Sequence, residues 1–334
     1  MRPTSMRTTV DFDAQGVQHG YLQLPHSRDD SAWGSVMLPV TVIRNGDGPT
    51  ALITGGNHGD EYEGPLAILD LAAQTKEAQV SGRIILIPFM NGPAVLAGRR
   101  TSPVDGGNMN RAFPGRPDGT VTDKIADYFT RTLLPMADLV LDFHSGGRTL
   151  DFLPFAASHV LDDKEQEGRC SAARDAFCAP FTVQMAEIDP ASMYDHAAES
   201  QGKTFVTTEL GGRGTATPET TAIARRGLRN VLIHAGILAG TIEPAPTRHI
   251  SQENPRCFHF SPAAGMIEFC ATIGDEIVTG DVLARIWPLD RTGTAPLDVT
   301  ARMDGLLTVR HHPGLIAQGD CLAVLSTDLH QKKG

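Results

Sequence analysis

The sequence lacks three features that would point to a specialised class of protein. Its five cysteines are odd in number and show no Cys-x-x-Cys spacing, which argues against a disulfide framework and against a thiolate metal site. No basic run occurs and the net charge is −10 at pH 7, so neither nucleic acid nor an anionic membrane is an expected partner. No apolar run approaches the roughly 20 residues that span a membrane, and residues 1–11 are polar, unlike a signal peptide. We therefore expect a soluble, cytoplasmic protein with reduced thiols.

The composition is that of an ordinary globular protein, with 41% hydrophobic and 20% charged residues. A chain of 334 residues is longer than one compact core usually holds, so we expect two domains. Residues 1–240 alternate apolar, β-rich runs with helical patterns. This alternation predicts an α/β fold with a mixed, mostly parallel sheet and helices on both faces. Residues 241–256 are rich in proline, threonine and polar side chains, which is typical of a linker.

Residues 257–334 are expected to form a smaller, all-β domain. Short alternating runs with Gly-Asp turns occur twice, in residues 265–283 and again in residues 305–322. Such a repeat resembles the paired half-motifs of a biotinyl/lipoyl-type barrel. A carrier domain of that kind needs a lysine in the hairpin between its halves, and the hairpin near residues 287–291 contains none. We therefore expect a structural or lid domain rather than a swinging carrier arm.

Polar side chains follow three of the apolar runs, at the point where each run gives way to glycines. The runs and side chains are 50–54 with His58 and Glu61, 138–143 with His144, and 203–208 with Glu209. The carboxyl ends of parallel strands meet at one edge of a sheet, where open α/β sheets bind their ligands. We therefore expect these four side chains to lie close together.

Two imidazoles and one carboxylate are one of the usual ligand sets of a catalytic zinc, which keeps a fourth position open. His58, Glu61 and His144 provide that set, and mixed nitrogen and oxygen ligands suit Zn²⁺ better than Mg²⁺ or Ca²⁺. Taken singly, His144 is better explained as an ordinary histidine near the edge of the sheet, but the shared position of all the candidates at strand ends favours a metal. Asp142 lies two residues before His144, on the same strand face. It could orient that ligand, or form hydrogen bonds in a turn instead.

The remaining candidates lie at a third strand end and on a long loop. A carboxylate beside a metal, here Glu209, can take a proton from water and later return it to the leaving nitrogen. The loop covers residues 91–119, and loops of that length are uncommon and usually functional. Within it, Arg111 offers a planar guanidinium that can bind a carboxylate bidentately, with Asn110 as a neutral donor beside it. Arg100 could stabilise the oxyanion, and its neighbour Arg99 is the alternative.

Four motifs in this order resemble those of the succinylglutamate desuccinylase/aspartoacylase family, which is related to the zinc carboxypeptidases. The motifs are His58-x-x-Glu61, Asn108-Met109-Asn110-Arg111-x-Phe113-Pro114-Gly115, Asp142-Phe143-His144-Ser145-Gly146 and Thr208-Glu209-Leu210-Gly211-Gly212. The resemblance covers about residues 20–240, and the β-rich C-terminal region also fits the family. It implies zinc ligation by His58, Glu61 and His144, general base catalysis by Glu209, and binding of the substrate carboxylate by Asn110 and Arg111.

The resemblance also implies a reaction. We expect zinc-dependent hydrolysis of the amide bond of an N-acyl amino acid, with one Zn²⁺ per chain, in a catalytic domain of residues 1–240. Within the family, the Gly-Asn-His-Gly-Asp-Glu-Tyr-Glu-Gly form of the first motif and the chain length are most similar to the branch that deacetylates N-α-acetyl-L-2,4-diaminobutyrate in ectoine degradation. Deacylation of another N-acyl amino acid is the alternative. The expected partner is the small-molecule substrate, and the sheet-rich C-terminal region is compatible with a homo-oligomer.

Two alternative functions are less favoured by the sequence. A zinc carboxypeptidase would use the same ligands, but the interval between Glu61 and His144 resembles the deacylase branch more than the longer interval of the peptidases. A carrier or interaction protein built on the repeated C-terminal region is the least favoured alternative, because the hairpin lysine is missing.

Overall fold

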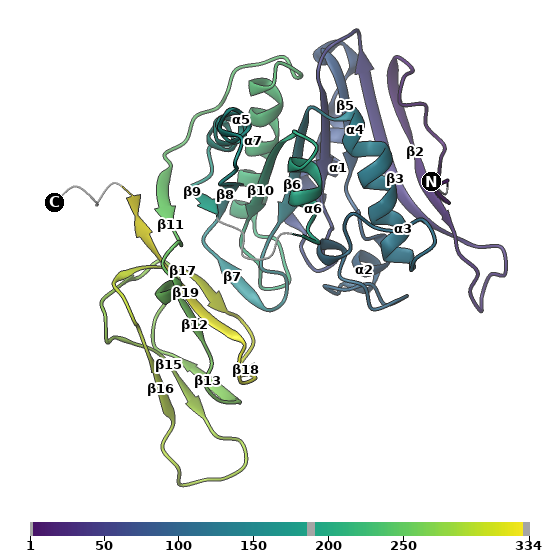
Figure 1. Ribbon diagram of the computed structural model, residues 1–334. Coiled ribbons are helices and arrows are strands. Elements are labelled where there is room, and N and C mark those ends of the chain that lie inside the picture. The colour runs from purple at the N-terminus through teal and green to yellow at the C-terminus, as the bar shows by residue number, and fades with distance from the viewer. Residues whose placement is uncertain (1–2, 186–190, 330–334) are drawn as a thin grey trace.

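The computed structural model describes residues 3–185 and 191–329, and its core is a mixed sheet with helices on both faces (Figure 1). The strands that form the first part of the sheet follow the hydrogen-bonded order β1-β2-β3-β5-β4-β6-β10-β8-β9-β11. Strand pairs β5/β4, β4/β6 and β6/β10 are parallel, and so are β8/β9 and β9/β11. The strands are β1 (Arg7–Thr8), β2 (Gly16–Pro25), β3 (Ser35–Asn45), β4 (Thr50–Thr54), β5 (Gly82–Ile87), β6 (Leu139–His144), β7 (Leu150–Phe152), β8 (Phe155–His159), β9 (Phe181–Met185), β10 (Thr204–Glu209) and β11 (Arg248–Ser251).

Helices cover the two faces of this sheet because its central strands are apolar on both sides. In β6, Val140 belongs to one buried cluster, together with residues of α3, η3, α4 and α6. Its neighbours Leu139 and Leu141 belong to the other cluster, together with residues of α1, α5 and α7. The α-helices are α1 (Glu63–Gln74), α2 (Gly92–Ala97), α3 (Val121–Tyr128), α4 (Leu134–Met136), α5 (Lys164–Ala176), α6 (Tyr194–Glu199) and α7 (Pro218–His234). There are also the 3₁₀-helices η1 (Glu77–Gln79), η2 (Met109–Arg111) and η4 (Pro255–Cys257), and the π-helix η3 (Phe129–Leu133).

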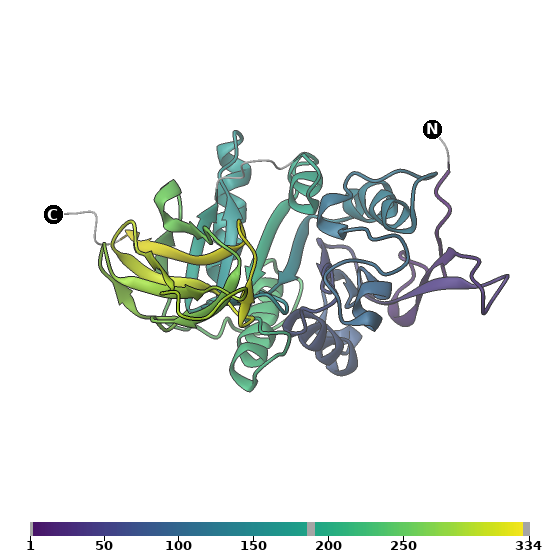
Figure 2. The same ribbon diagram turned by 90° about the horizontal axis from the view of Figure 1, so that it is seen from below.

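The C-terminal region is all β, and part of it continues the main sheet. Strand β19 pairs with β11, and β17 and β14 follow it in the same hydrogen-bonded order. A separate sheet has the order β16-β15-β13-β18. Figure 2 shows this region at one end of the molecule and the β2–β3 hairpin at the other. The strands are β12 (Phe258–Phe260), β13 (Gly265–Phe269), β14 (Glu276–Ile277), β15 (Val282–Trp287), β16 (Leu297–Thr300), β17 (Gly305–His311), β18 (Leu315–Ile316) and β19 (Cys321–Asp328).

Backbone hydrogen bonds join the C-terminal region to the first part of the chain at two places. Strand β7, which follows the loop after β6, pairs antiparallel with β17. The segment 241–256, expected as a linker, contains β11, which pairs with β9 on one side and with β19 on the other. The C-terminal strands therefore hold the segment that follows the carboxyl end of β6.

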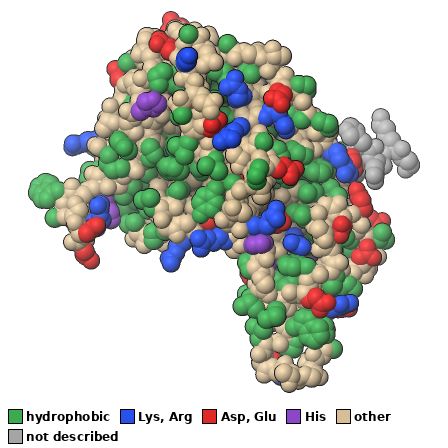
Figure 3. Space-filling model, turned by 180° about the vertical axis from the view of Figure 1, so that it is seen from behind, with side chains coloured by type: hydrophobic (Ala, Val, Ile, Leu, Met, Phe, Trp, Pro, Cys, Tyr) green, Lys and Arg blue, Asp and Glu red, His purple; other side chains and the backbone are tan. Residues whose placement is uncertain are grey.

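Two features of the structure concern the expected partners, namely the charge on the surface and the length and polarity of the helices. On the face drawn in Figure 3, acidic and basic side chains are scattered among hydrophobic and other polar groups. No helix within residues 3–185 and 191–329 has both the length and the apolar character needed to cross a membrane.

Candidate metal centre and substrate cavity

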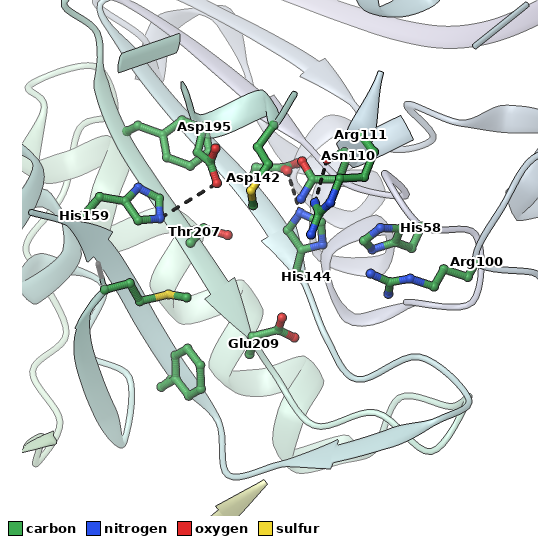
Figure 4. A pocket seen from close by; sticks show the side chains of 14 residues that line it. His58, Arg100, Asn110, Arg111, Asp142, His144, His159, Asp195, Thr207 and Glu209 are labelled. Atoms are coloured by element: carbon green, nitrogen blue, oxygen red, sulfur yellow. Dashed lines mark hydrogen bonds and ion pairs between the residues drawn. The ribbon is translucent and has the colours of Figure 1, made fainter. Parts of the chain in front are cut away.

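A cavity of about 160 Å³ lies over three neighbouring strands, β6, β10 and β8, at the sheet face covered by α6 (Figure 4). Alternate residues of each strand project into it, as the twofold repeat of a strand requires. The lining side chains are His58, Arg100, Asn110, Arg111, Asp142, His144, Phe155, His159, Met185, Met193, Asp195, Phe205, Thr207 and Glu209.

The strand register sorts these side chains into rows. His144 on β6 pairs with Glu209 on β10, which pairs in turn with Phe155 on β8. Because β8 runs antiparallel to β10, residues further along β8 lie beside earlier residues of β10. His159 accordingly stacks on Phe205, with 6.3 Å between the ring centroids. The cavity thus has a row at the strand ends and another row deeper along the sheet.

The sheet and its loops bring the three expected metal ligands together. Nδ1 of His58 lies 2.7 Å from Oε1 of Glu61, and Nδ1 of His144 lies 3.0 Å from Oε2 of the same carboxylate. The ligand atoms of the three residues all lie within 4.8 Å of one another. All three residues are buried, with exposed fractions of 2%, 3% and 8% for His58, Glu61 and His144. Two nitrogens and one carboxylate therefore converge on one small volume.

Burial and mutual attraction shift the pKa values of these groups in different directions. Burial opposes the charge on Glu61, but the two histidines outweigh it and hold the pKa of Glu61 well below its usual range. Burial likewise opposes the charge on His144, yet the carboxylates of Asp142 and Glu61 outweigh it and raise the pKa of that imidazole well above 6.5. For His58, burial dominates and lowers the pKa. The carboxylate is therefore ionised and ready to accept a cation.

Neighbouring side chains orient both imidazoles. Nε2 of His144 lies 2.9 Å from Oδ2 of Asp142, so that Nδ1 is directed toward Glu61. Asp142 is held in turn by Thr54 Oγ1 at 2.6 Å and by Asn57 Nδ2 at 3.1 Å. Asp142 thus contacts His144 directly, as the orienting role suggested by its position on the strand requires.

His58 is oriented on its own side of the site. Its Nε2 lies 3.1 Å from Oδ1 of Asn108, which leaves Nδ1 toward Glu61. The loop that carries His58 also packs tightly against α2. A Cβ atom on Gly59 would lie 2.0 Å from the backbone carbonyl carbon of Ala94, and the Gly59 N–H donates to the Arg99 carbonyl at 2.9 Å. Only glycine fits this position between the two ligands.

Glu209 stands in the same row as His144, on the adjacent strand. Its Oε2 is buried and has no hydrogen-bond partner among the described residues. Burial and the charge of Glu61 raise the pKa of Glu209 to about 8, and the cations His144 and Arg100 oppose that rise. A carboxylate of raised pKa with an unpaired buried oxygen in a cavity is typical of a general base.

The three expected residues of the long loop also line the cavity. Arg100 Nη1 lies 3.4 Å from Oε1 of Glu61, whereas Arg99 is not among the lining residues. Oδ1 of Asn110 accepts the backbone N–H of Tyr194 at 3.2 Å. This contact leaves the Nδ2 donors of the amide to serve a ligand. Arg111 is anchored by its own Nη1, which donates to the Asn110 carbonyl at 2.7 Å.

The donor set fits a divalent metal. Three buried ligands of mixed nitrogen and oxygen type, each nitrogen oriented by a second polar group, match a catalytic zinc site with one open position. The unpaired buried oxygen of Glu209 lies next to this set, where a cation would favour its ionised form.

Several residues that line the cavity or contact its side chains were not predicted from the sequence. His159 lies at the end of β8, and Asp195 lies in the first turn of α6, neither within a recognisable motif. Asn57 and Asn108 lie beside predicted site residues, so their neighbours in the motifs were the only available clue. Thr207 could have been found from its twofold spacing with Glu209 on β10.

Comparisons with known proteins agree with this geometry. A model of the succinylglutamate desuccinylase/aspartoacylase catalytic domain matches residues 47–235. The chain is 52% identical to the N-alpha-acetyl-L-2,4-diaminobutyric acid deacetylase of Halomonas elongata, over 97% of this chain and 96% of that protein. The product-bound structure of the ectoine utilization protein EutE (DoeB) from Ruegeria pomeroyi has a TM-score of 0.96 and 58% identity, covering 98% of this chain and all of that one. A succinylglutamate desuccinylase/aspartoacylase structure from Rhodobacter sphaeroides has a TM-score of 0.92 and 39% identity, covering 97% of this chain and all of that one.

The chain belongs to the succinylglutamate desuccinylase/aspartoacylase family. It is a deacylase that hydrolyses amide bonds, as the family resemblance in the sequence implied. The expectation of a mixed α/β fold is confirmed as well.

Proposed function

We propose that this protein is a zinc-dependent deacetylase of N-α-acetyl-L-2,4-diaminobutyrate. The observation that carries the proposal is the convergence of His58, Glu61 and His144, with their ligand atoms within 4.8 Å of one another beside Glu209. The substrate is taken from the Halomonas elongata deacetylase, which is 52% identical over almost the whole chain. A place in ectoine degradation is supported by the resemblance to the ectoine utilization protein of Ruegeria pomeroyi.

His58, Glu61 and His144 would hold one Zn²⁺ per chain. When bound there, zinc acts as a Lewis acid that polarises a carbonyl and lowers the pKa of water toward about 7. Asp142 and Asn108 keep the two imidazoles in the orientation that this requires, because each accepts a hydrogen bond from the Nε2 atom.

Glu209 acts as the general base. It takes a proton from the attacking water and returns it to the amide nitrogen as the C–N bond breaks, which frees the amino acid. Arg100, whose guanidinium lies 3.4 Å from Glu61 and lines the cavity, stabilises the negative charge that develops on the carbonyl oxygen. Acetate and 2,4-diaminobutyrate are the products.

Asn110 and Arg111 bind the α-carboxylate of the substrate. The backbone N–H of Tyr194 donates to the side-chain oxygen of Asn110, and this directs the Nδ2 donors of the same amide toward the cavity. Arg111 adds a guanidinium of fixed charge at the same rim, and the two together fix the direction in which the amide enters the site.

The C-terminal region, residues 257–334, serves as a structural or lid domain of biotinyl/lipoyl-like type, joined by the segment 241–256 to a catalytic domain of residues 1–240. Pairing of β17 with β7 supports this role, since β7 follows the loop that starts at Ser145, whose N–H donates to Glu61 at 3.0 Å. A cytoplasmic location and a homo-oligomer belong to the same proposal.

A panel of N-acyl amino acids and one blocked dipeptide, offered to zinc-loaded and chelator-treated protein, tests this function. The zinc-loaded protein should release acetate from N-α-acetyl-L-2,4-diaminobutyrate faster than from N-acetylaspartate or N-succinylglutamate, and chelation should abolish the release. Preferential cleavage of a blocked dipeptide would favour a carboxypeptidase, and faster cleavage of another N-acyl amino acid would overturn the assigned substrate.

A further inference from the structure

A second group of ionisable side chains lies in the deeper row of the cavity, apart from the metal ligands. Nε2 of His159 lies 3.8 Å from Oδ2 of Asp195, and Nδ1 of the same ring lies 2.7 Å from Oε1 of Glu199. His159 and Asp195 are 2% and 6% exposed, and both line the cavity. Figure 4 shows this pair facing the cavity across from Arg111 and Asn110. The chemistry proposed above uses neither residue.

The fold ties this group to the residues that hold the substrate carboxylate. Asp195 follows Tyr194, whose N–H donates to the side chain of Asn110 at 3.2 Å. The hydrogen bond between Tyr194 and Asn110 therefore fixes the position of Asp195 relative to Asn110. His159 is fixed independently, because its ring stacks on Phe205 of β10.

Charge is unevenly distributed in the cavity. The arginines that line it, Arg100 and Arg111, lie on the side of the long loop, whereas Asp195 lies on α6 at the opposite side (Figure 4). A ligand that carries an anionic and a cationic group at its two ends matches this distribution. A second carboxylate in place of the cation would face Asp195 and be repelled.

We propose that Asp195, with Nε2 of His159 beside it, binds the side-chain ammonium of the substrate and selects a diamino acid. A carboxylate only accepts hydrogen bonds, so in the contact with Glu199 the proton lies on Nδ1 of His159. The carboxylates of Asp195 and Glu199 both lie against this one imidazole, so the group has one more acidic than basic side chain. The ammonium nitrogen of a substrate can donate to Oδ2 of Asp195 and balance that excess. The proposal rests on the deacetylase function and specifies which side chain it accepts.

The subsite determines selectivity and takes no part in bond cleavage. Removing the charge of Asp195 should therefore weaken the binding of only those substrates that carry the ammonium. The test compares the wild type with Asp195→Asn on two substrates, N-α-acetyl-2,4-diaminobutyrate and N-acetylnorvaline, in which a methyl group replaces the ammonium. Asp29→Asn, the same change at an exposed position, is the control variant.

The expected result is a loss of about 30-fold or more in kcat/KM of Asp195→Asn for the diaminobutyrate substrate, the loss typical of an unpaired buried charge. Activity on N-acetylnorvaline should stay that of the wild type, and Asp29→Asn should match the wild type on both substrates. Equal losses on both substrates would mean that Asp195 only stabilises the start of α6, where its Oδ1 accepts the His196 N–H. No loss on either would also overturn the proposal.

A binding measurement separates failure of this subsite from failure of the deacetylase function. If the wild type cleaves no N-acetyl amino acid, calorimetry with free 2,4-diaminobutyrate and with norvaline replaces the assay. Tighter binding of the diamino acid, lost in Asp195→Asn, would support the subsite. Equal binding of the two amino acids by the wild type would refute it. If the wild type cleaves the diaminobutyrate substrate and Asp195→Asn cleaves it equally well, the proposed subsite is refuted but the deacetylase function is not.

Discussion

Nδ1 of His144 lies 3.0 Å from Oε2 of Glu61, although 83 residues separate the two in the sequence. The contact exists because β4 and β6 are parallel neighbours, so the loop after β4 and the last residue of β6 reach the same edge of the sheet. The candidate metal centre therefore follows from sheet topology, with one ligand pair local in sequence and the third brought in by the fold.

Glu209→Gln tests the proposed base. Glutamine keeps the size of the side chain but cannot take a proton, so turnover should fall by about 10²–10⁴-fold. Metal content, measured by mass spectrometry, should equal that of the wild type, since Glu209 is not among the three ligand residues. Glu253→Gln, at an exposed position, should leave turnover unchanged. Full activity of Glu209→Gln would remove this residue from the mechanism.

Asp142→Asn tests the orientation of a ligand. Asp142 Oδ2 lies 2.9 Å from Nε2 of His144, and substitutions of such outer partners weaken metal binding by about 10–100-fold. Competition between the protein and a metal-sensitive dye measures this affinity. Asp29→Asn is again the exposed control. An affinity equal to that of the wild type would show that the sheet alone positions the imidazole.

Gly59→Ala should destabilise the loop that carries His58. The added Cβ would lie 2.0 Å from the backbone of Ala94, so the loop or α2 must move, at a cost of about 1–3 kcal/mol. Gly168→Ala is the matched control, because Gly168 lies within α5 and a Cβ there meets no atom within 4 Å. That change should stabilise the protein by about 0.5–1 kcal/mol. Denaturant unfolding compares the two, and a Gly59→Ala variant as stable as the wild type would contradict the packing argument.

Glu63→Gln should change how stability depends on pH. Burial raises the pKa of Glu63 from its ordinary value of 4.5 to about 7. A raised pKa in the folded state means that stability is fully present below the unfolded pKa and is lost as pH rises through about 7. The free energy of unfolding of the wild type, relative to Glu63→Gln, should therefore fall by about 3 kcal/mol between the unfolded pKa of 4.5 and the folded pKa of about 7. A difference that is constant with pH would refute the shift.

The strands and helices of the first part of the chain were largely predictable. The apolar run 50–54 is β4, and the runs that end at His144 and Glu209 are β6 and β10, because buried parallel strands are continuously apolar. Strands β7 to β9 and helices α5 and α6 were not predicted, because this part of the sequence has few apolar residues in a regular period. Segment 241–256 contains β11 because its backbone completes the pairing between β9 and β19, which is a tertiary property.

For the site, proximity at strand ends was enough to group His58, Glu61, His144 and Glu209 in one place. The deeper row was not predictable in this way. Asp195 reaches the cavity only because α6 packs on the sheet face, and its sequence neighbours carry no motif that signals a ligand. Residues that belong to a helix covering a sheet enter a site through packing, which a single sequence does not encode in its local pattern.

The central claim is that His58, Glu61 and His144 share one divalent ion. The most direct test is the metal content per chain of purified wild type and of His144→Ala, measured by mass spectrometry together with deacetylase activity before and after chelation. The wild type should contain one zinc per chain and lose activity on chelation, with recovery on adding Zn²⁺, and His144→Ala should lack the metal. Wild type that contains no stoichiometric divalent metal, or that deacetylates equally well after thorough demetallation, would contradict the claim.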